Sequence, residues 1–159
     1  MESIEPARYE KGRPMLLGGL RQVHPYSESG SSIVEQWRQF KSIDRIPGRL
    51  GTNVYGVMCG QKVDGFEYMC AVEVENLAEL PDNLGRMRIQ AQEYGVFEHH
   101  GHRSTIRTTW ARIFEWLTNC GAYQSAHRPD FEIYDETVDP IDGSGRVEIW
   151  VSISRKPDS

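Results

Sequence analysis

The sequence predicts an α+β fold in which one antiparallel sheet carries two helices on one of its faces. Strand-like stretches, rich in β-branched and aromatic residues, occur at about 15–23, 52–60, 66–74, 87–99, 131–134 and 146–154. Two stretches between them place apolar residues at helical spacing, so the predicted order is β-α-β-β, repeated once. Because each helix has one apolar stripe, both must pack on the sheet, which gives two layers.

The second predicted helix, from about Thr105 to Cys120, has the strongest pattern in the chain. Ser104 is expected to cap its first turn, and Gly121 to adopt the left-handed conformation that ends many helices. The spacing of the apolar residues predicts one buried stripe, made of Ile106, Trp110, Ile113, Phe114 and Leu117. We therefore expect Phe114 to be buried against the sheet.

Ser32 and Glu35 are expected to form a capping box at the start of the first predicted helix, and Pro47-Gly48 ends it. Asp64-Gly65 predicts a hairpin turn between the two strands that follow. The apolar face of this helix consists of Ile33, Trp37, Phe40 and Ile43.

Residues 1–14 are polar and are expected to form a loosely held arm. The remainder, 15–159, is predicted to be a single domain, with repeats at about 15–75 and 87–154.

Composition and charge narrow the function classes. No apolar run approaches the roughly 20 residues that span a bilayer, and the acidic N-terminus lacks the features of a signal peptide. Three cysteines without metal-ligand spacing indicate reduced thiols, so we expect a cytoplasmic protein. The formal net charge of −5 argues against direct nucleic-acid binding, which favours a basic face.

Strand alternation predicts which side chains lie on the face without helices. In the last strand, Val147, Ile149, Val151 and Ile153 form the set expected to face the helices, so Glu148 and Trp150 point away. In the preceding strand Phe131 and Ile133 are expected to face the helices, so Glu132 and Tyr134 join that open surface. Met69 falls on the open side of its strand, and Tyr55 and Phe97 are possible additions.

Two carboxylates and two aromatic rings on one surface favour a pocket for a lipophilic cation. Rings supply apolar area and cation–π attraction, and a carboxylate neutralises the bound charge. The alternation does not distinguish whether Glu132 or Glu148 is the key acid. Each glutamate could also be an ordinary solvated strand residue.

Other chemistries have weaker support. His99 and His100 would point to opposite faces of a strand, and no acid or cysteine completes a set with them, so no metal site is expected. No glycine-rich phosphate loop and no nucleophile elbow occurs, and no cofactor is predicted.

Six sequence motifs together point to a known family. They are Tyr55-Gly56-Val57, Phe66-Glu67-Tyr68-Met69, Tyr94-Gly95-Val96-Phe97-Glu98-His99-His100-Gly101, Ile113-Phe114-Glu115-Trp116-Leu117, Pro129-Asp130-Phe131-Glu132-Ile133-Tyr134 and Val147-Glu148-Ile149-Trp150-Val151-Ser152-Ile153. With these motifs the sequence resembles the GyrI-like small-molecule-binding family, which includes the effector-binding domains of bacterial AraC-type and MerR-type multidrug regulators. In the last strand Ser152 stands where the family usually has proline.

The resemblance implies two β-α-β-β repeats about a pseudo-two-fold axis, with a ligand cleft on the face away from the helices. It implies a binder of bulky, often cationic, aromatic compounds, here expected as a stand-alone module without a DNA-binding domain. Two alternatives stay open. One is a hydrolase of reactive drugs in which Glu132 or Glu148 activates water beside Trp150. The other is a protein-interaction role such as gyrase inhibition. We expect a binding module rather than an enzyme.

Overall fold

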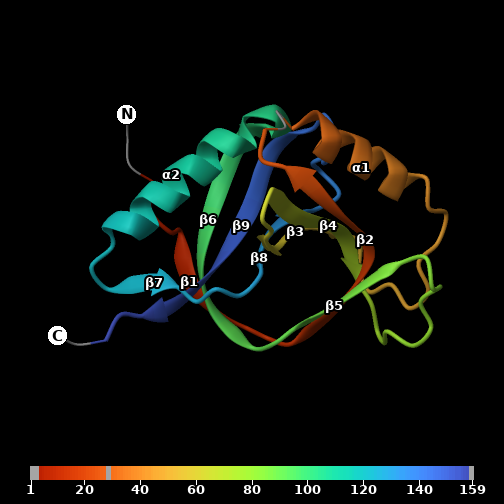
Figure 1. The fold of residues 1–159 in the computed structure, drawn as a ribbon, viewed down its shortest axis with the longest axis horizontal. Helices are drawn as coiled ribbons and strands as arrows, with labels where there is room; N and C mark the ends of the chain where they lie inside the picture. Colours follow the sequence, from red (N-terminus) through yellow and green to blue (C-terminus); the bar gives the residue numbers. More distant parts are fainter. Residues whose placement is uncertain (1–3, 28–29, 158–159) are drawn as a thin grey trace.

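The computed structural model describes residues 4–27 and 30–157, which form one nine-stranded sheet with both helices on the same face (Figure 1). The helices are α1, Ser31–Lys41, and α2, Ile106–Asn119, the latter preceded by a short 3-10 turn, Arg103–Thr105. The strands are β1 Arg8–Gly12, β2 Met15–Pro25, β3 Val54–Gln61, β4 Gly65–Glu73, β5 Gly85–Ile89, β6 Gln92–His102, β7 Tyr123–Ser125, β8 Asp130–Tyr134 and β9 Ser144–Arg155. The predicted α+β arrangement is confirmed.

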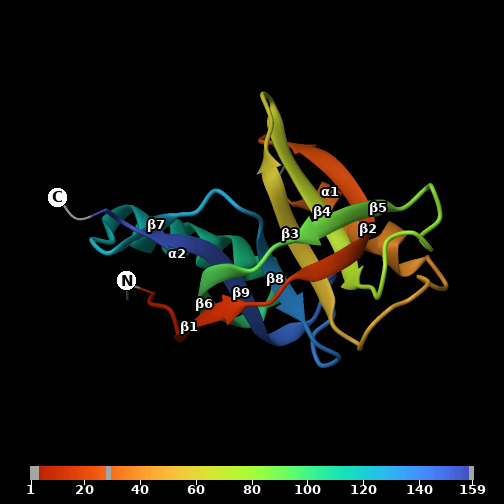
Figure 2. The same cartoon turned by 90° about the horizontal axis from the view of Figure 1, so that it is seen from below.

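Strand order brings the two predicted repeats together at the middle of the sheet. The order is β1-β6-β9-β8-β3-β4-β2-β5, and β7 adds to the far end of β9. The two repeats meet at the antiparallel pair β3–β8. On one side of this pair β4 and then β2 of the first repeat follow, and on the other side β9 and then β6 of the second repeat. This order is compatible with the expected pseudo-two-fold axis, which stays a prediction. Figure 2 shows β3, β4 and β2 in one half of the sheet and β6 and β9 in the other.

Both faces of the sheet are covered by apolar side chains. One core lies between the sheet and the helices and includes Trp37, Phe40, Ile113 and Ile149, as the helical spacing predicts. The second core lies on the opposite face and includes Leu17, Val57, Met69, Tyr94 and Phe131. The face without helices is therefore also a packed surface.

Several predicted details are wrong. The polar arm is not loose, because Arg8–Gly12 form β1 and pair with β6. The stretch 87–99 belongs to two strands, β5 and β6. Only Ile106, Trp110 and Ile113 of α2 are buried, and Phe114, which was expected to be buried with them, is 53% exposed. The stripe is thus narrower than the sequence pattern indicates.

The predicted helix ends also differ. Ser32 does not cap α1, which begins after Gly30 in a left-handed conformation (φ 103°), and the Ser32 hydroxyl instead bonds His24 Nδ1 at 2.7 Å. Gly121 is not among the glycines with positive φ in the described residues, and Cys120 ends α2 in an extended conformation. Ser104 lies within the 3-10 turn, where its own backbone N–H donates to His102 Nδ1.

Candidate functional site

A cavity of about 830 Å³ opens on the helix side of the sheet, bordered by residues of both helices. α1 contributes Ile33, and α2 contributes Ile106, Trp110 and Phe114. The sheet contributes Met58, Phe66, Tyr68, Asp130 and Glu132, and the 3-10 turn before α2 contributes Arg103. The cavity therefore combines an aromatic and aliphatic lining with charged groups, as small-molecule sites commonly do.

Glu132 is the buried acid of this cavity, with 2% of its surface exposed. Its Oε1 accepts hydrogen bonds from the hydroxyls of Tyr68, at 2.9 Å, and Tyr134, at 2.8 Å. Its Oε2 accepts one from Trp110 Nε1 at 2.7 Å. All three partners donate, which is the arrangement that an ionised carboxylate, able only to accept, requires. The site thus holds a buried anion without an ion pair within 4 Å among the described residues.

Glycine at position 56 makes this arrangement possible. Gly56 on β3 lies directly opposite Glu132 on one side and Cys70 on the other. A Cβ at position 56 would lie 2.0 Å from the Tyr68 hydroxyl and 2.6 Å from Glu132 Oε1. Any larger residue would occupy the space in which the two groups meet.

Packing beneath the cavity holds the two tyrosines in place. The fully buried Trp37 of α1 meets Tyr134 edge-on at a ring separation of 5.7 Å and Tyr68 at 6.3 Å. Burial raises the pKa of both tyrosine hydroxyls well above the ordinary value, and the neighbouring Glu132 raises it further. Both hydroxyls therefore keep their protons and remain donors to Glu132 across the physiological pH range.

Arg103 places a buried positive charge on the wall of the same cavity. It is 6% exposed, and its Nε donates to the Pro140 carbonyl at 2.6 Å. Burial would lower the pKa of its guanidinium, but the nearby Tyr134 and Glu132 keep it above the ordinary value. Arg103 is therefore a permanent cation beside the buried acid.

The predicted surface of Glu132, Tyr134, Glu148 and Trp150 is wrong, because the sheet divides the four residues between its two faces. Phe131 lies opposite Trp150 across the β8–β9 pair, and Glu132 lies opposite Ile149, which faces the helices. Glu132 and Tyr134 therefore point into the helix side. The cavity lies on the helix side of the sheet, whereas the cleft was expected on the face away from the helices.

On the other face, Trp150 and Glu148 form a separate cluster. Trp150 stacks on Phe131 at 5.7 Å and meets Tyr94 edge-on at 5.3 Å. Its Nε1 donates to Glu148, which also accepts from Arg8 at 2.9 Å. Although burial opposes it, these two hydrogen bonds hold the pKa of Glu148 below its ordinary value. Of the two acids in the hydrolase alternative, only Glu148 lies beside Trp150, whereas Glu132 lies on the other face of the sheet.

The other sequence-predicted residues are also distributed over both faces. Tyr55 and Met69 belong to the core around Trp150, whereas Phe97 lies in the helix-side core against Trp116. None of the three borders the cavity. Sequence reasoning missed Tyr68, Trp110 and Arg103. A signal was available for Trp110, because a buried indole N–H normally needs an acceptor.

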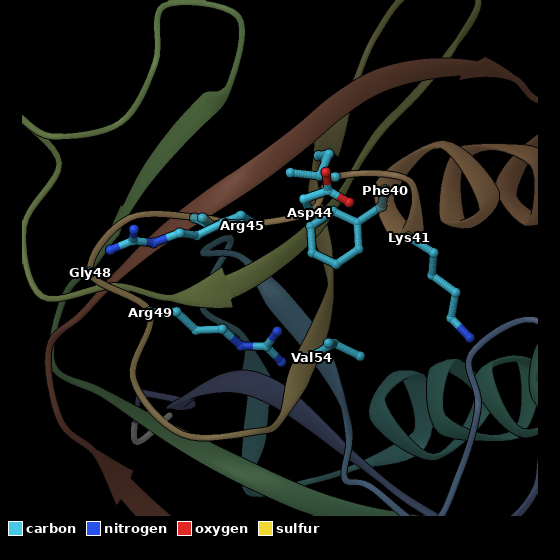
Figure 3. A pocket seen from close by; sticks show the side chains of 9 residues that line it. Phe40, Lys41, Asp44, Arg45, Gly48, Arg49 and Val54 are labelled. Carbon is cyan, nitrogen blue, oxygen red and sulfur yellow. The ribbon is translucent and has the colours of Figure 1, made fainter.

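A smaller cavity of about 480 Å³ lies between the end of α1 and the loop that leads to β3. Figure 3 shows Phe40 beside it and the arginines Arg45 and Arg49 on the loop. Its charged residues Lys41, Asp44, Arg45 and Arg49 are exposed, so its one acid is not buried as Glu132 is. We therefore take the larger cavity as the candidate site.

Two further features of the described residues concern metal binding and membrane crossing. In residues 4–27 and 30–157, no group of three or more histidine, cysteine, aspartate or glutamate side chains could hold a metal ion. No helix in that part of the chain has the length and apolar character that crossing a bilayer would need.

Comparisons with solved structures agree with the fold. The protein SAV2435, whose structure was determined bound to tetraphenylphosphonium, is 17% identical and superposes with a TM-score of 0.74, over 97% of this chain and 94% of that one. The integron cassette protein VCH_CASS2 of Vibrio cholerae is 15% identical with a TM-score of 0.66, over 96% and 98% of the two chains. At these identities the likeness concerns the fold.

Sequence comparison goes further. The transcriptional regulator BrlR of Pseudomonas aeruginosa is 28% identical over 130 residues, which are 80% of this chain and 48% of the regulator. The chain thus spans about half the length of that relative. The family model described as integron-associated effector binding protein, Cass2, matches residues 13–153. The GyrI-like resemblance is confirmed, and this chain belongs to the family of integron-associated effector binding proteins.

Proposed function

We propose that this protein binds lipophilic aromatic cations in the cavity between α1 and α2, with the positive charge next to Glu132. The observation that carries the proposal is a carboxylate, 2% exposed, at the base of a cavity with aromatic walls. Its family of effector binding proteins and the tetraphenylphosphonium bound by SAV2435 support the same ligand class.

The chemistry favours a cation with delocalised or shielded charge. Three protein donors already satisfy Glu132, so a ligand does not need to donate a hydrogen bond to it. A bulky cation would instead gain Coulomb attraction in a poorly solvated site, where such attraction is stronger than in water. A small, strongly hydrated cation would lose its water shell without replacement, so the site should discriminate against it.

Aromatic side chains would supply most of the apolar affinity. Phe114 is 53% exposed and stacks on Trp110 at a ring separation of 5.7 Å. An exposed phenylalanine at a cavity rim is a ready contact for an aromatic ligand, because binding would bury it. Trp110 would thereby serve twice, as a donor to Glu132 and as a wall of the cavity.

Titration with tetraphenylphosphonium, followed by calorimetry, tests the proposal. Glu132→Gln should weaken binding by about 1.5–3 kcal/mol, the usual size of a charge-assisted contact. Affinity for triphenylphosphine oxide, which is neutral and similar in shape, should change much less. Because glutamine places an amide N–H₂ near donors, the folded fraction of the variant is checked by circular dichroism.

The matched control is Glu148→Gln, which removes an acid from the other face of the sheet. It should leave tetraphenylphosphonium affinity unchanged. If Glu148→Gln weakens binding and Glu132→Gln does not, the cation binds on the Trp150 face and this assignment is wrong.

A further inference from the structure

The charged groups around the cavity are balanced rather than acidic. Three carboxylates, those of Glu67, Asp130 and Glu132, and three guanidinium groups, those of Arg103, Arg107 and Arg128, contribute to its lining. Glu67 is bonded to Arg21 at 2.7 Å and 3.1 Å, and Asp130 accepts from the Ser152 backbone N–H at 2.7 Å. A site built only for a cation would not need a buried arginine in its wall.

Arg103 is the unusual member of this set, because it is 94% buried while Arg107 and Arg128 are exposed. The Pro140 carbonyl fixes its Nε at 2.6 Å, and no hydrogen-bond partner among the described residues is found for its two terminal nitrogens. Among the described residues, the side-chain nitrogen and oxygen atoms that are sealed from solvent and lack a partner belong to Trp37 and Arg112 only. The terminal nitrogens of Arg103 are not among them, so they are not sealed from solvent. The terminal nitrogens of Arg103 therefore keep some contact with solvent, and Arg103 itself borders the cavity.

From this arrangement we propose that the cavity accepts zwitterionic aromatic ligands, with the cationic centre beside Glu132 and a carboxylate held by the terminal nitrogens of Arg103. The inference rests on the proposed function and extends it by a second subsite. A planar guanidinium with two free donor groups matches a carboxylate in geometry, and a partly desolvated site strengthens the pair. The ligand would thus neutralise both buried charges of the cavity at once.

A dye pair tests this subsite. Rhodamine B carries a xanthylium cation and a carboxylate at pH 7.5, whereas rhodamine B ethyl ester keeps the cation and the ring system but lacks the anionic charge. Fluorescence anisotropy would give the dissociation constant of each dye, and the quantity compared between variants is the dissociation constant of the ester divided by that of the acid. Arg103→Met should lower this ratio by about tenfold or more, because it weakens binding of the acid and not of the ester. Arg103→Lys should retain part of the preference.

Arg146→Gln is the control, because Arg146 is an exposed arginine that is bonded to Glu98 at 2.8 Å and does not border the cavity. It should leave the ratio unchanged. Both dyes are measured on the same preparation of each variant. Partial unfolding would therefore lower the number of binding sites equally for the two dyes and leave the ratio of their dissociation constants unchanged. Circular dichroism spectra of each variant should match the parent spectrum.

The outcomes separate the inference from the proposed function. If Arg103→Met changes both dyes by the same factor, Arg103 is only a counter-charge for Glu132 and the carboxylate subsite does not exist. If tetraphenylphosphonium binds and rhodamine B does not, the zwitterion inference is overturned while the cation proposal stands. If neither tetraphenylphosphonium nor either dye binds, both fail.

Discussion

Gly56→Ala is the substitution that most sharply tests the geometry around Glu132. The new methyl group would lie 2.0 Å from the Tyr68 hydroxyl, 2.6 Å from Glu132 Oε1 and 2.9 Å from Tyr68 Cζ, whereas ordinary contacts begin near 3.4 Å. The tyrosine ring cannot simply rotate away, because Trp37 packs against it and the residue is 1% exposed. The hydroxyl must therefore leave Glu132.

Two costs follow from this displacement. Overpacking in a core typically costs about 1–3 kcal/mol. A lost hydrogen bond to a buried charged group costs about 1.5–3 kcal/mol. Because the two terms overlap, we expect a total loss of about 2–5 kcal/mol in the free energy of unfolding. Urea denaturation measures it as a lower midpoint at an unchanged slope.

A double-mutant cycle with Tyr68→Phe isolates the mechanism. Tyr68→Phe alone removes the hydroxyl bond and should cost about 1.5–3 kcal/mol. Added to Gly56→Ala, it also removes the atom that the methyl group hits first, so the double variant should be at least about 1 kcal/mol more stable than additivity requires. Gly121→Ala is the control, since a Cβ there meets nothing within 4 Å. A Gly56→Ala protein as stable as Gly121→Ala, or strict additivity in the cycle, would refute the reasoning.

Three further outcomes are expected. Phe114→Ala should change the urea midpoint little, because the ring is 53% exposed, but should weaken cationic and neutral aromatic ligands alike, as calorimetry would measure. Trp150→Ala should cost about 3–5 kcal/mol in stability without loss of ligand specificity, because its ring packs on Phe131 on the other face; a selective loss of cation affinity would contradict this. Burial raises the pKa of Asp130 from 3.8 to about 6, so its protonated form stabilises the fold at low pH and this contribution is lost as the pH rises to about 6. Relative to the parent, Asp130→Asn should therefore gain about 2 kcal/mol of stability between pH 4.5 and 7.5, and equal pH profiles of the two proteins would disprove it.

The fold could be predicted from the sequence because periodicity identifies most of the helices and strands. Which side chains of β8 face the helices could not be predicted. β8 has apolar or aromatic residues at 131, 133 and 134, and both faces of the sheet are packed at this strand. Alternation then separates two sets of side chains without showing which set meets the helices. The pairing of Phe131 with Trp150 settles the direction, and it depends on contacts about 20 residues apart in the chain.

Glu132 and Tyr134 were predicted to lie on the same face of the sheet, because residues two apart on a strand share a face, and they are bonded at 2.8 Å. Their other partners were not predicted. Tyr68 comes from another repeat, and Trp110 lies on a helix stripe that reads as core by spacing alone. The helical spacing also predicted that Phe114 is buried, which is wrong, because spacing alone cannot show that a cavity leaves one side of the helix uncovered.

Ser152, where the resemblance implies proline, has a physical role in this chain. Its backbone N–H donates to Asp130 at 2.7 Å, and its hydroxyl bonds the Arg128 carbonyl at 3.0 Å. Proline has no N–H and could not make the first of these bonds. The serine thus attaches the segment before β8, which borders the cavity, to the last strand.

Anomalous diffraction from a crystal soaked with tetraphenylarsonium would test the central claim most directly, because arsenic marks the position of the positive charge. We expect one arsenic peak in the cavity between α1 and α2, next to Glu132 and in contact range of Trp110 and Phe114. A peak beside Glu148 and Trp150, on the other face of the sheet, would contradict the account.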